Sequence, residues 1–484
     1  IEDVRYFRAH ELIVRYSTIY HSWASSATAI FLNAHISCFE HSLAKLNCSI
    51  ESSSSEDAVL SSLSKIFEKF LTARLLRFFN INNIISPYQF GFQRNISVTD
   101  AITLLVDNIY EALNSKKHHL SIFVDLQKAF DTVNHTILLK KLHSYGIRGL
   151  PLDYICSYLK NRRQCVKICQ SVSETVTTNI GIPQGSTVGP LLFLIYVNDL
   201  PNVSKLFSSI LFADDTTFCV SNTDFPTMVD SANSELNKIK IWSYINRLSL
   251  NIGKTFCMLF TNMKRKVDNS IVPYFDNQEL KFETSEKFLG MHIDSNLSFI
   301  DHISAICNKI SKFVGIFYRI ASNVPYELLI NLYYSFVYPY LIFGVSIWGG
   351  AGNVHLNRIL LLQKKLVRII TKSDYLAHSD PLFFKTKILK IQDVYKYNVA
   401  TYMYRRKTAG NISTASEFHN HSTRYANYYV PPKFQRLKIS QRSLSYCGPR
   451  IWNDIPYEIQ QSRSLVNFKS NLKKFFVEGY MLNY

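Results

Sequence analysis

The stretch Phe212-Ala213-Asp214-Asp215 decides the fold of this 484-residue chain. Two adjacent carboxylates lie there between two apolar, β-prone runs, Ser209-Ile210-Leu211-Phe212 and Thr216-Thr217-Phe218-Cys219-Val220. Such runs around a short polar segment predict a β-hairpin with the acids at its turn. Two like charges side by side need compensation, because a buried unpaired charge is costly. The pair is therefore either a solvated tight turn or a set of oxygen ligands for a hard divalent cation.

A third acid follows another apolar run. The stretch Leu120-Ser121-Ile122-Phe123-Val124-Asp125 predicts a buried strand that ends in a carboxylate, and residues 137–145 predict a helix. Between the acidic sites lies Gly181-Ile182-Pro183-Gln184-Gly185-Ser186, followed by an apolar helical run over residues 188–197. A Gly/Pro loop before a helix brings backbone close to a phosphate, and ligands commonly gather at strand ends. These surroundings favour the metal-ligand explanation.

The three stretches, in this order, resemble the palm of reverse transcriptases, and the match is nearest to non-LTR (LINE-type, jockey-like) retrotransposons. The motifs are Val124-Asp125-Leu126-Gln127-Lys128-Ala129-Phe130-Asp131, the loop at 181–186 continuing through Gly189-Pro190-Leu191-Leu192-Phe193 to Asn198-Asp199-Leu200-Pro201, and Phe212-Ala213-Asp214-Asp215-Thr216. The resemblance covers residues 58–484. It implies an α+β, right-hand polymerase with helical fingers, an antiparallel palm, a helical thumb and a mostly helical basic C-terminal region.

The resemblance also implies the chemistry of an RNA-directed DNA polymerase. Such an enzyme transfers a nucleotidyl group from a dNTP to a primer 3′-hydroxyl on an RNA template. Two Mg²⁺ ions, with Mn²⁺ as the alternative, clamp the attacking and leaving oxygens, and Mg²⁺ prefers a few carboxylates plus substrate phosphates. By the resemblance, Asp125, Asp214 and Asp215 are the catalytic metal ligands, and the Leu126 carbonyl is an extra candidate at the nucleotide site.

Further side chains take roles from the same resemblance. Phe130 would be the steric gate that selects dNTPs, and Gln184 and Gly185 would bind the incoming nucleotide. Lys254 would donate a proton to pyrophosphate, and Phe288-Leu289-Gly290 would grip the primer end. Each of three residues also has a plainer explanation: a core aromatic for Phe130, an ordinary loop residue for Gln184, and a solvated charge for Lys254.

Composition favours a polyanionic partner. The chain holds 54 Lys and Arg against 36 Asp and Glu, a formal net charge of +18, which suits nucleic acid and would also suit an anionic membrane. The last 84 residues carry 13 Lys and Arg against four acids, interleaved with aromatic residues. This pattern suits template RNA or target DNA, or else it is a solvated basic face.

The nine cysteines include no Cys-x-x-Cys pair, so we expect neither a zinc site nor disulfides. We expect an intracellular protein of nucleus and cytoplasm.

Secondary structure is predicted along the rest of the chain. Residues 98–113 and 239–251 predict helices, residues 281–299 predict strands, and the chain after His302 is predicted to be helical. Residues 328–356 contain no charged side chain, a length that could span a bilayer. Their Tyr, Pro and Gly content argues against a span, so we expect no stable membrane association. The sequence leaves the oligomeric state open.

Four regions are expected. Residues 1–57 are an unassigned, atypical segment, residues 58–262 form fingers and palm, residues 263–350 complete the palm and form the thumb, and residues 351–484 form a basic nucleic-acid-binding region. The family carries a basic segment at the start of its fingers, whereas residues 52–63 contain no Lys or Arg. We therefore expect that this start is missing or replaced. The upstream endonuclease usual in the family is not recognised in this chain.

Three functional hypotheses remain. The first is a working reverse transcriptase whose partners are an RNA template, a DNA primer or target DNA, and dNTPs. The second is a catalytically inactive, truncated relic that binds nucleic acid. The third is another palm polymerase, such as an intron-encoded maturase or an RNA-templated RNA polymerase, against which the aromatic gate argues. Use of dNTPs or NTPs would separate the third from the first.

Overall fold

The protein is described from a computed structural model, which covers residues 62–168, 170–183, 185–261, 271–408, 429 and 440–482. The chain divides into two compact units, Ile1–Leu75 with Asn134–Gly189, and Leu76–Val133 with Pro190–Tyr484. The three predicted acids belong to the second, larger unit. The glycine loop of residues 181–186 belongs to the first. The four regions expected from the sequence stay a prediction.

A five-stranded sheet forms the centre of the larger unit, with strand order β11-β8-β1-β7-β6. The strands are β1 (His118–Val124), β6 (Ser208–Phe212), β7 (Asp215–Asn222), β8 (Phe256–Phe260) and β11 (Lys281–Phe282). Every residue of β1 is buried, and β1 pairs antiparallel with both β7 and β8. The sequence predicts an antiparallel palm. This prediction is wrong for the edge strand β11, which runs parallel to β8 and whose first residue, Lys281, pairs with Phe256 at the start of β8.

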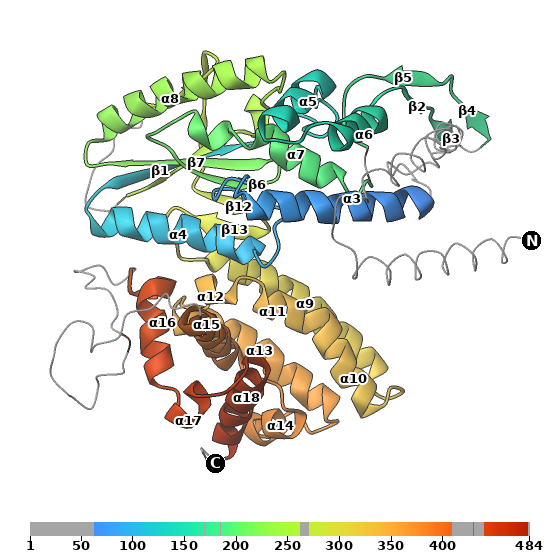
Figure 1. Ribbon diagram of the computed structural model, residues 1–484. Coiled ribbons are helices and arrows are strands. Elements are labelled where there is room, and N and C mark those ends of the chain that lie inside the picture. The colour runs from blue at the N-terminus through green and yellow to red at the C-terminus, as the bar shows by residue number, and fades with distance from the viewer. Residues whose placement is uncertain are drawn as a thin grey trace, which may run out of the picture. The chain divides into compact units, whose positions relative to one another are not determined.

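Two helices, α4 (Val98–Asn114) and α8 (Phe225–Ile245), pack on opposite faces of this sheet (Figure 1). Successive side chains of a strand point to opposite faces, so β1 contributes to both packed layers. The His118 ring lies 5.9 Å from Phe225 of α8, whereas Phe123 shares an apolar core with α4. The α4 prediction is confirmed.

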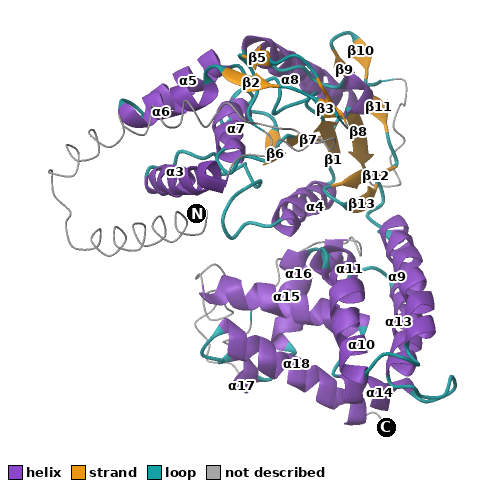
Figure 2. Ribbon diagram, turned by 90° about the vertical axis from the view of Figure 1, so that its right-hand side faces the viewer, coloured by secondary structure: helices purple, strands orange, loops and turns teal. Residues whose placement is uncertain are grey.

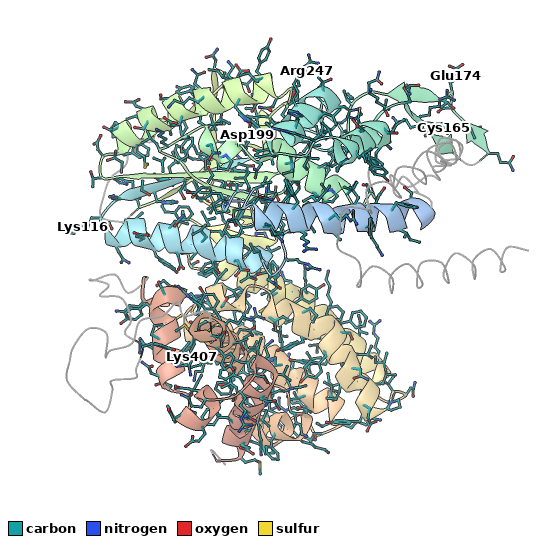
Figure 3. The ribbon with its side chains drawn as sticks, viewed as in Figure 1. Lys116, Cys165, Glu174, Asp199, Arg247 and Lys407 are labelled. Carbon is teal, nitrogen blue, oxygen red and sulfur yellow. The ribbon has the colours of Figure 1, made fainter. Side chains whose placement is uncertain are left out.

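The prediction of a helix over residues 239–251 is wrong beyond Ile245. Asn246 caps α8 through its backbone N–H, which donates to the carbonyl of Trp242. Arg247, labelled in Figure 3, then takes a left-handed φ of 52°, which a continuing helix cannot accommodate.

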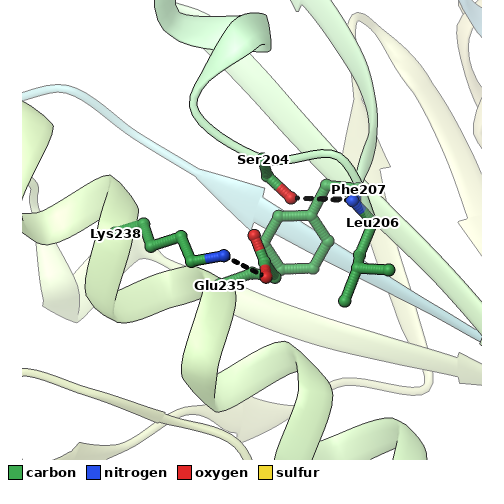
Figure 4. Close-up of polar contacts among 5 residues, drawn as sticks. All are labelled: Ser204, Leu206, Phe207, Glu235 and Lys238. Atoms are coloured by element: carbon green, nitrogen blue, oxygen red, sulfur yellow. Dashed lines mark hydrogen bonds and ion pairs between the residues drawn. The ribbon is translucent and has the colours of Figure 1, made fainter.

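The turn before β6 is fixed by its own hydrogen bonds and lies beside Glu235 of α8 (Figure 4). Glu235 on α8 is 3% exposed and pairs with Lys238 at 2.7 Å. The Ser204 hydroxyl accepts the backbone N–H groups of Leu206 at 3.2 Å and Phe207 at 3.0 Å. The Phe207 ring stacks on Phe218 of β7 at 5.3 Å. The strand that leads to the acids is therefore fixed at its start.

The C-terminal part of the larger unit is helical (Figure 2). A hairpin of β12 (Ser285–Phe288) and β13 (Met291–Asp294) precedes α9 (Ile300–Ile320). The helices that follow are α10 (Tyr326–Leu332), η3 (Tyr333–Val337), α11 (Tyr338–Ile342), α12 (Val345–Trp348), α13 (Asn353–Ile370), α14 (Ser379–Thr386), α15 (Ile391–Thr408), η5 (Ser440–Arg442), α16 (Leu444–Asn453), α17 (Tyr457–Gln460) and α18 (Leu465–Leu482). One apolar core joins α4, β13, α9, α13 and α15. The predictions of strands around residues 281–299 and of a helical thumb and C-terminal region are confirmed for the described residues.

The uncharged stretch of residues 328–356 is divided among several short helices. Pro339 lies at the start of α11, and Gly344, with a φ of 58°, separates α11 from α12. None of the helices in the described ranges combines the length and the apolar run that crossing a bilayer requires.

The smaller unit contains the first residues of α3 (Ser62–Ile81), then α5 (His135–Ser144) and α6 (Leu150–Leu159). Two short hairpins follow, made of β2 (Arg162–Gln164) with β5 (Val176–Thr178) and β3 (Lys167–Ile168) with β4 (Ser171–Val172). The unit ends at the first residue of α7 (Gly189–Val197). The helices predicted over residues 137–145 and 188–197 are confirmed.

Candidate active site

The hairpin of β6 and β7 presents two of the acids. Phe212 pairs with Asp215 across the ladder, so Ala213 and Asp214 form a two-residue turn and Asp215 begins β7. Ala213 has a φ of 59°, a left-handed conformation that is unfavourable for a residue with a Cβ. The predicted hairpin with the acids at its turn is confirmed.

A segment from before α4 holds this turn in place. Gln89 is 2% exposed, and its Oε1 accepts the backbone N–H groups of Gly91 at 2.8 Å and Ala213 at 3.2 Å. The backbone of residues 88–91 also pairs with Leu211 in β6. A Cβ on Gly91 would lie 2.4 Å from the Ala213 nitrogen, so only glycine permits this approach. The strained turn is therefore stabilised by a neutral amide and a close backbone contact.

Asp125 follows the last residue of β1 and is tied to the segment that carries Lys254. The Asn251 N–H donates to the Asp125 carbonyl at 2.8 Å, and Leu126 forms a bridge with Leu250. The short helix η2 (Ile252–Lys254) comes next and brings Lys254 Nζ to 3.8 Å from Asp125 Oδ2. The Lys254 side chain is 72% exposed, so this ion pair contributes little stability. The structure thus brings Lys254 and Asp125 together.

The three acids interact electrostatically. Val124 lies opposite Thr216, which places Asp125 and Asp215 at the same end of adjacent strands. Burial raises the pKa of Asp215, and the neighbouring charges of Asp214 and Asp125 raise it further. Clustered carboxylate oxygens of this kind fit a hard divalent cation, which would relieve their repulsion. In the part of the chain that the structure describes, no three His, Cys, Asp or Glu side chains are already arranged as ligands, so a cation would have to draw these acids together.

A cleft of about 180 Å³ opens beside the acids. The turn between β12 and β13 contributes to it, with φ angles of 46° at Leu289 and 91° at Gly290. The Phe288 ring lies edge-on to Phe123 at 5.1 Å. The lining residues include Asp125, Asp215, Lys254, Lys287, Phe288 and Leu289. Two of the predicted primer-grip residues therefore share a cleft with two of the predicted metal ligands.

The surroundings of Phe130 fit both a core aromatic and a steric gate at the nucleotide site. Its ring stacks on the fully buried Phe193 at 4.6 Å with an interplanar angle of 28°. The side chain is only half-buried, so part of it stays free to meet a ligand.

The predicted nucleotide loop is described only in part. Gly185 is exposed with a φ of 75° and lies in the smaller unit. Gln184 lies outside the described residues. The roles of both in nucleotide binding stay predictions.

Sequence reasoning missed the residues that support the site. Besides Gln89 and Gly91, Asn198 is 6% exposed, and its side chain accepts the Ser86 N–H at 2.7 Å and donates to the Ile84 carbonyl at 2.8 Å. These contacts fix the chain just before residues 88–91. A signal was present for Asn198, which lies within a quoted motif, but the partners of Asn198 and Gln89 are more than 100 positions away.

Comparison with known proteins agrees with this geometry. Residues 58–293 match the family described as "Reverse transcriptase (RNA-dependent DNA polymerase)". The chain is 28% identical over 347 residues to the RNA-directed DNA polymerase from mobile element jockey of Drosophila funebris, and 26% identical over 358 residues to that of Drosophila melanogaster. These matches cover 69% and 72% of this chain but only 37% and 39% of the relatives. The chain therefore spans well under half of their length.

Among solved structures, the chain is similar to telomerase from Candida albicans, with 14% identity and a TM-score of 0.37 over 73% of this chain and 52% of that one. The family match covers the five-stranded sheet and the β6–β7 hairpin that carry the three acids. The predicted fold class, an α+β right-hand polymerase, is confirmed. Residues 58–293 thus match the reverse transcriptase family, and the chain is similar over 69–72% of its length to the RNA-directed DNA polymerases of non-LTR, jockey-like retrotransposons.

Proposed function

We propose that this chain synthesises DNA on an RNA template by transferring a nucleotidyl group from a dNTP to a primer 3′-hydroxyl. One observation carries the proposal. Asp125 directly follows β1, Asp215 begins the adjacent strand β7, and both line one cleft with Phe288 and Leu289 of the hairpin of β12 and β13. The cleft thus combines acidic groups that suit metal ions with the apolar side chains of Phe288 and Leu289, which suit a primer end.

Divalent metal ions are in general use in the reverse transcriptase family, and here Asp125, Asp214 and Asp215 would hold Mg²⁺ or Mn²⁺. Two such ions supply charge stabilisation at the attacking and leaving oxygens. The chain contributes positioning, since the sheet and Gln89 fix the three carboxylates. Lys254 Nζ, beside Asp125, offers a proton to the departing pyrophosphate.

We assign the selection of dNTPs and the binding of nucleotide, template and primer to other residues. The exposed part of Phe130 would exclude a ribose 2′-hydroxyl, and Gln184 with Gly185 would contact the nucleotide. Template RNA and primer DNA would bind through phosphate contacts of the basic chain, whose formal charge is +18. We place this activity inside the cell, in the nucleus and cytoplasm.

A second candidate function is binding of nucleic acid without synthesis. It is favoured by the absence of Lys and Arg from residues 52–63, where the family carries basic residues. Such a chain would keep the salt-sensitive binding of a basic protein and lose turnover.

Primer extension on poly(rA)/oligo(dT) with Mg²⁺ tests the two candidates. The control is the Asp214→Asn/Asp215→Asn double variant, which removes charge with little change in volume. Extension by the natural chain that falls at least about 10³-fold in the variant supports synthesis, because each carboxylate acts directly on the metal ions. RNA binding should be retained in the variant. Absence of extension with tight RNA binding would favour the second candidate.

Phe130→Ala tests the gate. We expect the ratio of ribonucleotide to deoxyribonucleotide incorporation to rise, a ratio that does not depend on how much protein is folded. Phe193→Leu is the matched control, because it weakens the ring stack and leaves the exposed part of Phe130 in place. An unchanged ratio in Phe130→Ala would remove the gate role.

A further inference from the structure

Glu68 is a buried carboxylate for which the proposed function has no use. It lies on α3 in the smaller unit and is 1% exposed. Glutamate is almost never fully buried unless it is paired or hydrogen-bonded, because its charge loses hydration. The environment of Glu68 therefore has to supply strong donors.

Those donors come from the end of the glycine loop and from α6. Glu68 Oε2 accepts the backbone N–H of Thr187 at 2.5 Å, and Oε1 accepts the Tyr158 hydroxyl at 2.9 Å. The Tyr158 oxygen is also 2.9 Å from Ser186 Oγ, which accepts the Gly189 N–H at 2.9 Å. Since each hydroxyl has one proton, the bonds run in one direction, from Gly189 through Ser186 and Tyr158 to Glu68.

The charge and protonation of this cluster favour the same arrangement. Burial raises the pKa of Tyr158, so its hydroxyl stays protonated and available as a donor. Burial lowers the pKa of Arg162, and the Glu68 carboxylate opposes that shift. Hydrogen bonds to a charged acceptor are stronger than those between neutral groups.

These bonds all converge on one short segment. Residues 185–187 comprise the last two residues of the Gly/Pro loop and Thr187, which follows it, and Ser186 and Thr187 bond directly into the cluster. Gly185 itself is exposed, with a left-handed φ of 75°. The exposed Gly185 is therefore followed directly by two residues, Ser186 and Thr187, that are hydrogen-bonded into the cluster around the buried Glu68 carboxylate.

We propose that Glu68 is a positioning residue, which fixes residues 185–187 in the conformation that binds the incoming nucleotide. The proposal rests on the proposed function, in which Gln184 and Gly185 contact that nucleotide. Glu68 does not touch substrate. It acts through the Thr187 backbone and through the Tyr158 and Ser186 hydroxyls, so its loss should weaken nucleotide binding more than it slows the chemical step.

The first test needs no activity and uses the full chain. Amide hydrogen exchange at Thr187 should become about tenfold faster in Glu68→Ala, because a partly buried donor loses its charged acceptor. Glu68→Gln should fall between this variant and the natural chain, since one amide oxygen still accepts. Tyr158→Phe should shift exchange in the same direction by less. Glu174→Ala, an exposed acid of the same unit labelled in Figure 3, should change nothing.

The second test is steady-state primer extension. In Glu68→Ala the KM for dNTP should rise about tenfold, with kcat and primer–template binding nearly unchanged, as expected when only nucleotide positioning is lost. A lower melting temperature with unchanged KM and unchanged Thr187 exchange would overturn the proposal. If the natural chain does not extend primers, the proposed function fails, and the exchange measurement still decides whether Glu68 fixes the segment. Should Glu68→Ala not fold, Tyr158→Phe and Glu68→Gln decide in its place.

Discussion

The acidic turn of residues 213–215 and the segment of residues 185–187 at the end of the glycine loop are stabilised in opposite ways. At the turn, carboxylates repel one another, the backbone is left-handed at Ala213, and the external support is the neutral amide of Gln89. At the loop, the one buried carboxylate, Glu68, accepts a backbone N–H and a tyrosine hydroxyl. The carboxylates near the turn raise one another's energy, whereas the Glu68 carboxylate accepts hydrogen bonds from donors of the chain itself.

This difference indicates which segment awaits a ligand. Strain and uncompensated charge persist where the surrounding structure enforces them, and they concentrate at functional sites. A satisfied buried charge instead fixes a scaffold. Removing charge at the turn should therefore stabilise the folded protein, whereas removing the supports of either segment should destabilise it.

Gly91→Ala should have the largest effect on stability. The added Cβ would lie 2.4 Å from the Ala213 nitrogen and 3.0 Å from the Phe212 carbonyl carbon, and neither backbone atom can move without opening the turn. We expect the free energy of unfolding, measured in urea, to fall by about 3 kcal/mol. Gly315→Ala in α9 is the control, since its Cβ would meet nothing within 4 Å and should stabilise the helix by about 1 kcal/mol. Equal effects of the two changes would show that the turn tolerates displacement.

Gln89→Ala should rank second. It leaves two buried N–H groups, those of Gly91 and Ala213, without their acceptor, so we expect a loss of about 2 kcal/mol in the free energy of unfolding. Gln93→Ala is the matched control, because that side chain donates a single bond of 3.2 Å to the Gln89 carbonyl. If both variants lose the same amount, the support of the turn lies elsewhere.

Local pattern accounts for what the sequence predicted correctly. The strands β1, β6 and β7 follow from runs of apolar and β-branched residues, and the turn follows from the polar pair between them. Each of these features is encoded within about ten neighbouring residues, so a single sequence suffices. The extent of the helix before Asn246 was missed because its capping bond and the left-handed Arg247 have no strong residue signal.

Contacts between distant segments account for what the sequence did not reveal. Gln89 and Ala213 are 124 positions apart, and Glu68 and Thr187 are 119 apart. Nothing in the local pattern around Glu68 distinguishes it from a solvated helix residue, although it is buried in the fold. The parallel edge strand β11 likewise depends on where the chain returns after the hairpin of β9 (Tyr274–Phe275) and β10 (Gln278–Glu279).

Asp215→Asn should change the free energy of unfolding less than Gln89→Ala does, and it should raise it rather than lower it. The raised pKa of Asp215 means that the folded protein binds this proton more tightly than the unfolded chain does, so the ionised carboxylate destabilises the fold at neutral pH. In EDTA at neutral pH the variant should be more stable by up to about 1 kcal/mol, a limit set by solvent screening of a carboxylate that is only partly removed from water. The gain should vanish as the pH falls through the raised pKa, because Asp215 then becomes neutral. A gain that persists at low pH would exclude charge repulsion as its cause.

Ala213→Gly should change stability least, because two opposing effects nearly cancel. Glycine removes the cost of a left-handed Cβ, about 1 kcal/mol, yet it also gives the unfolded chain more freedom, which costs about 0.5–1 kcal/mol on folding. We expect the free energy of unfolding to change by less than about 0.5 kcal/mol. Primer extension should nevertheless fall, since a glycine turn holds Asp214 less firmly against the repulsion of its neighbours. Unchanged extension at unchanged stability would mean that the sheet ladder alone positions the acids, and the contrast between a strained turn and a satisfied loop would then have no consequence for catalysis.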